Sequence, residues 1–286
     1  MFGTRRALIS QKSNILTGAA LMLRSEQSGV GIDFLDNSMV VRDPVTFANS
    51  YVGLPFSKLS GATRASSGTF IGSNGLLQTA GNNVPRFDYN PITHAPLGVL
   101  FEPAATNLAL WSNDLTQASW VKTNMTAALT KIGTDGIVNS ATLLTATAPN
   151  ATVLQTITQG SAAFVYGACV ERVTGSGTIS MTMDGGATYT AISPTAPWTK
   201  FPIPSQTLAN PSFGFKITTN GDQIAVFGNQ TEAGSISTST IVTVGASATR
   251  AVDNEATLAS SLFNLSPTSM TLFLDVDWAG GTSANP

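Results

Sequence analysis

The chain has 286 residues, enough for two or three compact units if a domain takes roughly 100–200 residues. Only 14 residues are Lys or Arg and 16 are Asp or Glu, and the formal net charge is −2. Nucleic-acid binding needs clustered Lys and Arg, so this composition argues against a DNA or RNA partner. No apolar run approaches the roughly 18 residues of a membrane-spanning helix. The single cysteine excludes an intramolecular disulfide.

Residues 1–50 are the least regular part of the sequence. Apolar residues recur near helical spacing between Ile15 and Leu23, and Gly29 and Gly31 follow. This stretch lacks the repeated apolar pattern of a folded domain, so we interpret 1–50 as an attachment segment.

Residues 51–104 are dense in turn-forming residues and leave room only for short extended pieces. These turn formers include Gly61, Gly68, Gly72, Asn74-Gly75, Gly81, Pro85, Pro91, Pro96 and Pro103. We expect an extended connector that lacks enough apolar surface to fold alone.

From 105 to 250 the pattern is that of short antiparallel strands. Residues 178–183 alternate strictly, with Ile179, Met181 and Met183 on one face, and Asp184-Gly185-Gly186 then predicts a hairpin into residues 187–192. A second pattern has an apolar face before a turn and a return strand after it: Phe213, Phe215, Ile217, then Asn220-Gly221, then Ile224 and Val226. Repeated strands of this kind predict a jelly-roll β-sandwich, and hence a mainly β fold.

The last zone, 251–286, contains one further predicted strand. Apolar residues alternate over 268–278, at Met270, Leu272, Leu274, Val276 and Trp278. An isolated strand needs partners. We therefore interpret 251–286 as the start of a further lectin-like module or as a strand swapped onto a neighbouring subunit.

One four-residue string occurs twice. Ala62-Thr-Arg-Ala65 and Ala248-Thr-Arg-Ala251 each precede a change of pattern, so both are interpreted as module junctions.

Several longer strings follow one another in a fixed order: Ala62-Thr-Arg-Ala-Ser-Ser-Gly-Thr-Phe-Ile-Gly-Ser-Asn-Gly-Leu-Leu-Gln-Thr-Ala80, Pro85-Arg-Phe-Asp-Tyr-Asn-Pro91, Gly98-Val-Leu-Phe-Glu-Pro103, Thr106-Asn-Leu-Ala-Leu-Trp-Ser-Asn-Asp-Leu115 and Trp120-Val-Lys122. This order closely resembles a module of tailed-phage tail-fibre and head-fibre proteins. In that family a jelly roll similar to carbohydrate-binding modules often follows, and then a concanavalin A-like lectin domain.

The end of the predicted jelly roll continues the resemblance. The run Phe227-Gly-Asn-Gln-Thr-Glu-Ala-Gly234 and the second Ala-Thr-Arg-Ala string resemble the family's last strand and its exit. The matched strings bracket residues 62–251. The family usually has an Arg shortly before the Thr-Asn-Leu run, and Ala104-Ala105 stands there instead, so any bridge made by that Arg is not expected here.

The sequence contains few candidate catalytic residues. His94 is the only histidine, and it lies in a turn between Pro91 and Pro96. A glycosidase would need two carboxylates beside the scissile bond. The acidic residues weighed within the jelly roll are Glu171, Asp184, Asp222 and Glu232. Predicted turns explain Asp184 and Asp222, and Glu232 belongs to the terminal-strand motif, so we expect no enzyme activity, no metal and no cofactor.

Sugar binding is the chemistry that the sequence favours, because pyranose rings stack on exposed aromatic rings. Tyr189 and Trp198 lie in or beside predicted loops and are the candidate sugar-binding residues. Trp111 and Trp120 belong to the family strings and are expected in the core. Packing in the core or in an interface is the competing interpretation for Trp198.

The resemblance implies a structural virion protein of a tailed bacteriophage, a fibre or spike subunit that attaches to the host surface through carbohydrate. It would be assembled in the host cytoplasm, bound to other virion proteins through residues 1–50, with no membrane partner. Fibre-like assemblies are symmetric, and we expect a homotrimer. A polysaccharide-degrading tailspike enzyme and a head-decoration fibre with the same fold are the alternatives.

Overall fold

The computed structural model describes residues 30–33, 38–42, 49–51 and 63–254. The regular secondary structure of these residues is entirely β-strand. Within these ranges, no helix is long and apolar enough to cross a membrane. The helical spacing at 15–23 and the strand expected at 268–278 lie outside the described residues.

Two groups of short strands precede the main domain. The first is an antiparallel sheet in the order β1-β2-β3, built from β1 (Val30–Asp33), β2 (Ser38–Arg42) and β3 (Asn49–Tyr51). The second consists of two β-hairpins within residues 63–104, which we call the hairpin unit: β4 (Gly68–Ile71) with β5 (Leu77–Ala80), and β6 (Phe87–Tyr89) with β7 (Pro96–Val99). Each of these four strands is short, because Gly and Pro interrupt the sequence every few residues.

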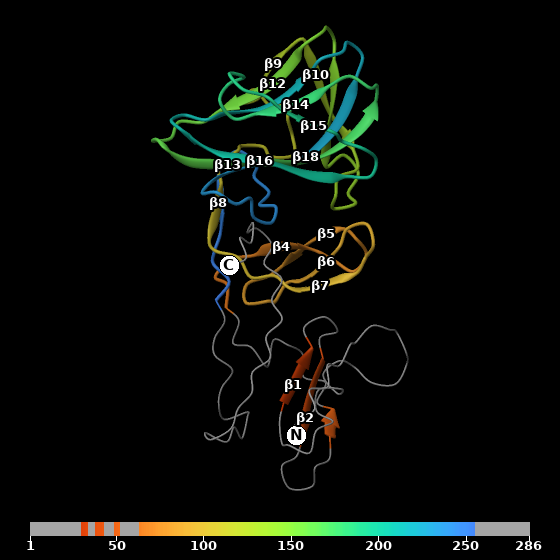
Figure 1. The fold of residues 1–286 in the computed structure, drawn as a ribbon, viewed down its shortest axis with the longest axis vertical. Helices are drawn as coiled ribbons and strands as arrows, with labels where there is room; N and C mark the ends of the chain where they lie inside the picture. The colour runs from red at the N-terminus through yellow and green to blue at the C-terminus, as the bar shows by residue number, and fades with distance from the viewer. Residues whose placement is uncertain (1–29, 34–37, 43–48, 52–62, 255–286) are drawn as a thin grey trace, which may run out of the picture.

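Residues 105–250 contain a β-sandwich of two five-stranded antiparallel sheets, which lies beside the hairpin unit (Figure 1). The sheet that we call the β13 sheet has the order β10 (Met125–Lys131), β11 (Ala141–Ala146), β18 (Gln223–Ala233), β13 (Ala162–Thr174), β16 (Thr199–Leu208). The β17 sheet has the order β15 (Thr190–Ile192), β14 (Ile179–Thr182), β17 (Ser212–Ile217), β12 (Ala151–Thr156), β9 (Val121–Thr123). The chain passes repeatedly between the sheets, which confirms the predicted jelly-roll sandwich.

The core lies between the two sheets and follows the predicted alternation. Met181 and Phe215 are fully buried on the inner face of the β17 sheet, and Tyr166 of β13 faces them from the other sheet. The Tyr166 ring lies 5.1 Å from that of Phe213 and 6.0 Å from that of Phe215. The Trp120 ring meets Phe213 edge-on at 5.7 Å, so the expectation that Trp120 packs in the core is confirmed.

The hairpin predicted after residue 183 is confirmed, because β14 pairs with β15. The return strand predicted after Asn220-Gly221 needs a correction. β17 and β18 do not pair with each other: β17 lies between β14 and β12, and β18 lies between β11 and β13 in the opposite sheet. Phe213, Phe215 and Ile217 of β17 and Ile224 and Val226 of β18 all belong to the core, so the turn places the two strands on opposite sides of the core instead of side by side.

A closing segment, residues 235–247, covers the outer side of β18. Gln230 and Glu232 pair with residues of β13 that point away from the core, and both side chains are buried beneath this segment. Glu232 accepts hydrogen bonds from Thr238 N at 2.9 Å and from its Oγ1 at 2.6 Å. Glu232 is therefore a structural partner, as its place in the terminal-strand motif indicates. Two short strands complete the unit, β8 (Ala105–Asn107) paired with β19 (Ala248–Arg250).

Candidate functional site

The two copies of the Ala-Thr-Arg-Ala string lie at one place in the structure. Thr63 and Asn254 pair across an antiparallel bridge, with N···O distances of 2.8 and 2.9 Å. Arg64 of the first copy forms an ion pair with Asp253 at 2.9 Å, and Arg250 of the second copy approaches the same carboxylate at 3.4 Å. The strings are therefore junctions between the beginning and the end of one unit.

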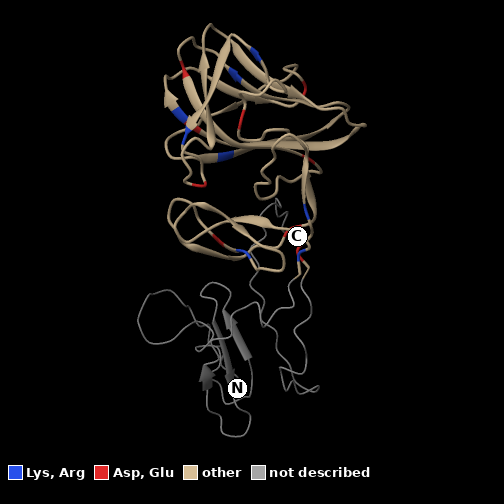
Figure 2. Ribbon diagram, turned by 180° about the vertical axis from the view of Figure 1, so that it is seen from behind, with Lys and Arg blue, Asp and Glu red and all other residues tan. Residues whose placement is uncertain are grey.

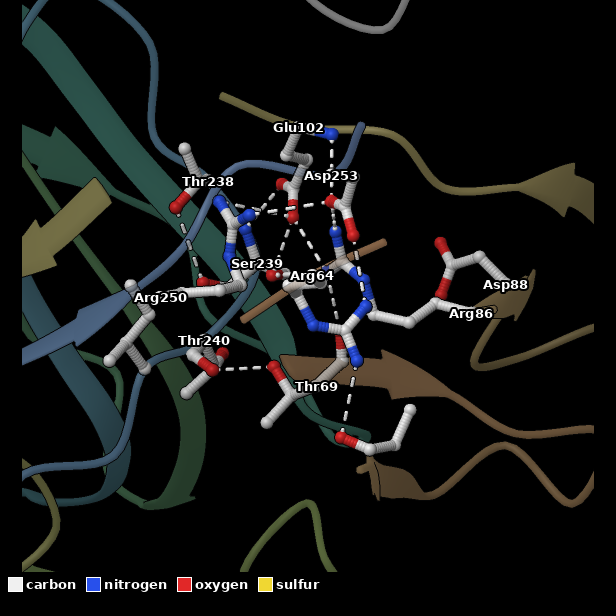
Figure 3. Close-up of polar contacts among 12 residues, drawn as sticks. Arg64, Thr69, Arg86, Asp88, Glu102, Thr238, Ser239, Thr240, Arg250 and Asp253 are labelled. Atoms are coloured by element: carbon white, nitrogen blue, oxygen red, sulfur yellow. Dashed lines mark hydrogen bonds and ion pairs between the residues drawn. The ribbon is translucent and has the colours of Figure 1, made fainter. Parts of the chain in front are cut away.

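Arg86 completes this ion cluster from the hairpin unit, and its side chain is fully buried. Its Nη1 donates to Glu102 Oε2 at 2.8 Å and to Ser239 Oγ at 2.9 Å, and its Nη2 pairs with Asp253. Figure 3 shows the side chains of Arg64, Arg86, Glu102, Arg250 and Asp253 pointing toward one another. We call this cluster the clamp; it consists of Arg64, Arg86, Glu102, Arg250 and Asp253.

Glu102 connects the clamp to the closing segment over the sandwich. Its carboxylate accepts hydrogen bonds from Ser239 N at 2.7 Å and Ser239 Oγ at 2.6 Å, and Arg250 Nη2 lies 3.4 Å away. Burial alone would raise the pKa of Glu102. The Ser239 hydrogen bonds and the charges of Arg250 and Arg86 nevertheless hold that pKa below its ordinary value. At neutral pH the Glu102 carboxylate is thus ionised and held by Ser239 and the two arginines.

The clamp has a structural role. Figure 2 shows how sparsely charged residues are spread over the ribbon, yet five of them meet here, four of them with side chains no more than 7% exposed. Each carboxylate is shared between arginines and backbone or hydroxyl donors, which leaves little for a substrate to bind. These ion pairs connect the two ends of the unit, although Nε of Arg86 and Nε of Arg250 are buried without a hydrogen-bond partner.

Tyr189 lies against the outer face of the β17 sheet. Its ring lies 4.8 Å from Nζ of Lys216, whose side chain is on the outer face because its neighbours Phe215 and Ile217 fill the core. The loop before Tyr189 folds back on β14, since Thr182 Oγ1 accepts a hydrogen bond from Gly186 N at 3.0 Å. The half-buried ring therefore forms part of the outer surface of the sandwich.

Other residues of this outer face are hydroxyl-bearing or apolar. Thr152 of β12 pairs with Lys216, and Leu154 pairs with Val121 of β9. Val121 is 65% exposed, and Leu154 is half-buried. This face of the sandwich thus presents an aromatic ring, a cation, hydroxyl groups and exposed apolar surface.

Trp198 belongs to a different part of the sandwich. It is half-buried and directly precedes β16 of the β13 sheet, whereas Tyr189 directly precedes β15 of the β17 sheet. The two predicted sugar-binding residues are thus attached to different sheets, and the assignment of each stays a prediction.

Three of the four carboxylates weighed for catalysis have structural partners. Asp184 accepts hydrogen bonds from Thr188 and Thr182, and although burial opposes it, these bonds lower its pKa to about 2. Asp222 accepts a hydrogen bond from Gly177 N at 2.7 Å and pairs with Arg172 at 3.5 Å. His94 is an exposed turn residue with φ of 57°. These residues maintain turns and the closing segment, as their sequence positions indicate.

Sequence reasoning missed the clamp as a site. The repeated string contained the signal, because it holds two of the three arginines, and the strings ending at Pro91 and Pro103 contain Arg86 and Glu102. Asp253 lies just beyond the second copy and had no motif of its own. In a chain so poor in charged residues, the recurrence of charged residues within the matched strings is the pattern that could have revealed it.

No family model and no curated protein matches the sequence. Among solved structures, the chain is similar to the enzymatically active domain of bacteriophage CBA120 tailspike protein 4, with 14% identity and a TM-score of 0.33. That match covers 46% of this chain and 21% of the other, so the chain spans about a fifth of that protein's length. It is also similar to the CBM22-1 xylan-binding domain of Paenibacillus barcinonensis Xyn10C, with 10% identity, a TM-score of 0.35 and coverage of 46% and 94%. A third similar structure, a point mutant of the family 29 carbohydrate-binding module CBM29-2, has 10% identity, a TM-score of 0.31 and coverage of 46% and 92%. TM-scores this low add nothing to the fold that the strand order already defines.

Proposed function

We propose that this chain is a structural protein of a tailed-phage particle, a fibre or spike subunit whose jelly roll binds carbohydrate on the host surface. The observation that carries the proposal is the clamp. The strings that resemble phage fibre proteins are far apart in the sequence, and four of their charged residues meet with Asp253 in one buried cluster: Arg64, Arg86, Glu102 and Arg250. The resemblance is thus supported by a structural reason for its motifs.

The clamp also gives the unit a geometry suited to display. Thr63 and Asn254 pair side by side, so the chain enters and leaves the unit of residues 63–254 at one place. A sandwich held in this way can project from a particle to which residues 1–50 are fixed. In this proposal the protein resides in the virion, after assembly in the host cytoplasm.

The outer face around Tyr189 supports carbohydrate as the ligand class. An aromatic ring stacks on the apolar face of a pyranose, while Lys216 and the threonine hydroxyls can bind its oxygens. These groups come from neighbouring strands of one rigid sheet, which reduces the entropy lost on binding.

The test is binding of the purified full chain to host cells and to their isolated surface polysaccharide. Tyr189→Ala should weaken binding by about tenfold, because stacking on an aromatic ring contributes about 1.5 kcal/mol at most. Tyr189→Phe should bind like the parent, since the ring is kept. Tyr89→Ala, in the hairpin unit, is the matched control and should not alter binding. Unchanged binding by Tyr189→Ala would reject this face as the site, and no binding by the parent would reject carbohydrate recognition.

The enzyme alternative is tested on the same polysaccharide. We expect no new reducing ends after prolonged incubation. A parent protein that cleaves the polymer, and a Glu171→Gln or Glu232→Gln variant that does not, would replace the binding proposal with a tailspike depolymerase. A map of the particle showing where residues 1–50 dock would distinguish a tail fibre from a head-decoration fibre.

A further inference from the structure

A lysine ammonium lies among backbone carbonyl groups at the edge of the sandwich. Lys122 is the middle residue of β9, and its side chain reaches back to the loop of residues 115–120 that precedes the strand. Its Nζ contacts four carbonyl oxygens, those of Leu115 at 2.9 Å, Thr116 at 3.3 Å, Gln117 at 3.2 Å and Trp120 at 2.8 Å.

This arrangement has more acceptors than the ammonium has protons. A lysine ammonium carries three N–H donors, so four carbonyl oxygens cannot each receive a separate linear hydrogen bond. A spherical cation has no such restriction, because it attracts every oxygen around it equally. Four carbonyls turned toward one point are therefore the coordination pattern of a cation site.

The surroundings of the loop also favour a positive charge. The carboxylate of Asp114 is near enough to interact electrostatically with Lys122. Asp114 itself is held by Thr116 N at 3.1 Å and by Gln117 Nε2 at 2.6 Å, both from the same loop. Leu115 at the start of the loop and Trp120 at its end are both buried in the core. The geometry of the carbonyl groups is thus fixed at both ends.

We propose that the loop of residues 115–120 is a cation site occupied in the native protein by the tethered ammonium of Lys122. Without that ammonium the site would take a free monovalent cation of similar size. The inference is independent of the carbohydrate proposal, since it concerns a loop distinct from Tyr189.

The distances select the class of cation. The four N···O separations of 2.8–3.3 Å exceed the contacts of about 2.3–2.6 Å that Ca²⁺ makes with oxygen. Potassium channels surround K⁺ with backbone carbonyl oxygens of this kind. The four carbonyls carry no formal charge, which also suits a monovalent ion better than a divalent one. Potassium is therefore the expected occupant.

The experiment removes the Lys122 ammonium by mutation and supplies K⁺ in its place. The full chain is prepared as Lys122→Ala and Lys122→Ser, and thermal unfolding is followed in potassium chloride against tetramethylammonium chloride at equal ionic strength. Tetramethylammonium is too large for the site. Potassium should raise the Tm of both variants by about 2–4 °C, as expected when a ligand binds only the folded state. The parent should show no difference between the salts.

Lys122→Met is the matched control, because its side chain fills the site without a charge and should leave the Tm equal in both salts. A second control, Lys131→Ala on β10, should behave like the parent. The proposal would be overturned if potassium had no effect on Lys122→Ala and Lys122→Ser, or if these two variants failed to fold in either salt. Stabilisation by Ca²⁺ and not by K⁺ would overturn the choice of ion and with it the argument from the distances.

Discussion

Asp253 is the residue on which most of the clamp's contacts converge. Its carboxylate forms ion pairs with Arg64 and Arg86 and lies 3.4 Å from Arg250. It also accepts a hydrogen bond from Glu102 N at 3.0 Å. The three arginines come from both ends of the unit. A single carboxylate thus holds together segments that are far apart in the sequence.

Removing this carboxylate should destabilise the unit strongly. Asp253→Ala leaves buried guanidinium groups without a counter-charge, and the expected loss is about 3–5 kcal/mol in the free energy of unfolding. Urea denaturation followed by tryptophan fluorescence measures it. Glu171→Ala, which removes a half-buried carboxylate on β13, is the control and should cost much less. A similar effect of the two substitutions would show that the clamp adds no particular stability.

The same cluster should make stability depend on pH in the acid range. The pKa of Glu102 is lowered on folding from an ordinary value of 4.5, so its contribution is present above pH 4.5 and is lost as pH falls through the folded pKa. The free energy of unfolding should therefore decrease below pH 4.5. Glu102→Gln should have a shallower decrease over that range. Parallel profiles for parent and variant would contradict the assignment of this pH dependence to the clamp.

At the scale of elements, β17 depends on a glycine at its centre. Gly214 has φ of 154°, and a Cβ there would lie 2.0 Å from the carbonyl oxygen of Val153 on β12. The neighbouring atom is backbone in a paired strand, so it cannot move aside cheaply. A side chain at this position would push β12 away from β17, the central strand of the sheet.

Gly214→Ala should therefore lower the free energy of unfolding by about 3 kcal/mol, the upper end of the range for overpacked sites. Gly160→Ala is the matched control, because a Cβ at Gly160 meets no atom within 4 Å. Thermal unfolding of the two variants beside the parent measures the difference. Equal Tm values for both would show that β12 and β17 can separate without cost.

At the scale of the whole molecule, the hairpin unit exposes apolar side chains. Five large ones are 38–63% exposed: Leu76, Val84, Ile92, Leu97 and Phe101. We expect these side chains to contribute to a contact between subunits, which would cover them.

We therefore expect a homotrimer, the symmetric state predicted from the sequence for a fibre subunit. Light scattering of the purified full chain should give three times the mass of 29.6 kDa. Leu97→Asp should shift this mass toward that of the monomer, because it places a charge in the apolar surface. A parent protein that is monomeric at micromolar concentration would contradict the expectation.

The sequence alone was sufficient for the faces of the strands whose apolar residues alternate. Ile179, Met181 and Met183 were assigned to one face from their alternation, and all three are fully buried. This succeeds because side chains alternate between the two faces of a strand, so the pattern of apolar residues records which face is covered. The hairpin after residue 183 was predicted for the same reason, since turn geometry is local.

Only the tertiary structure decided which segments meet. The turn at Asn220-Gly221 indicates a reversal, but the choice between pairing in one sheet and crossing to the other depends on distant strands. The clamp joins Arg64 to Asp253 across 189 positions, and no local pattern specifies a partner at that separation. Likewise, Tyr189 was selected for its loop position, but its place over Lys216 follows from the pairing of β14 with β17. Strand periodicity is a property of neighbouring residues, whereas ion pairs and sheet order are set by the packing of the whole chain.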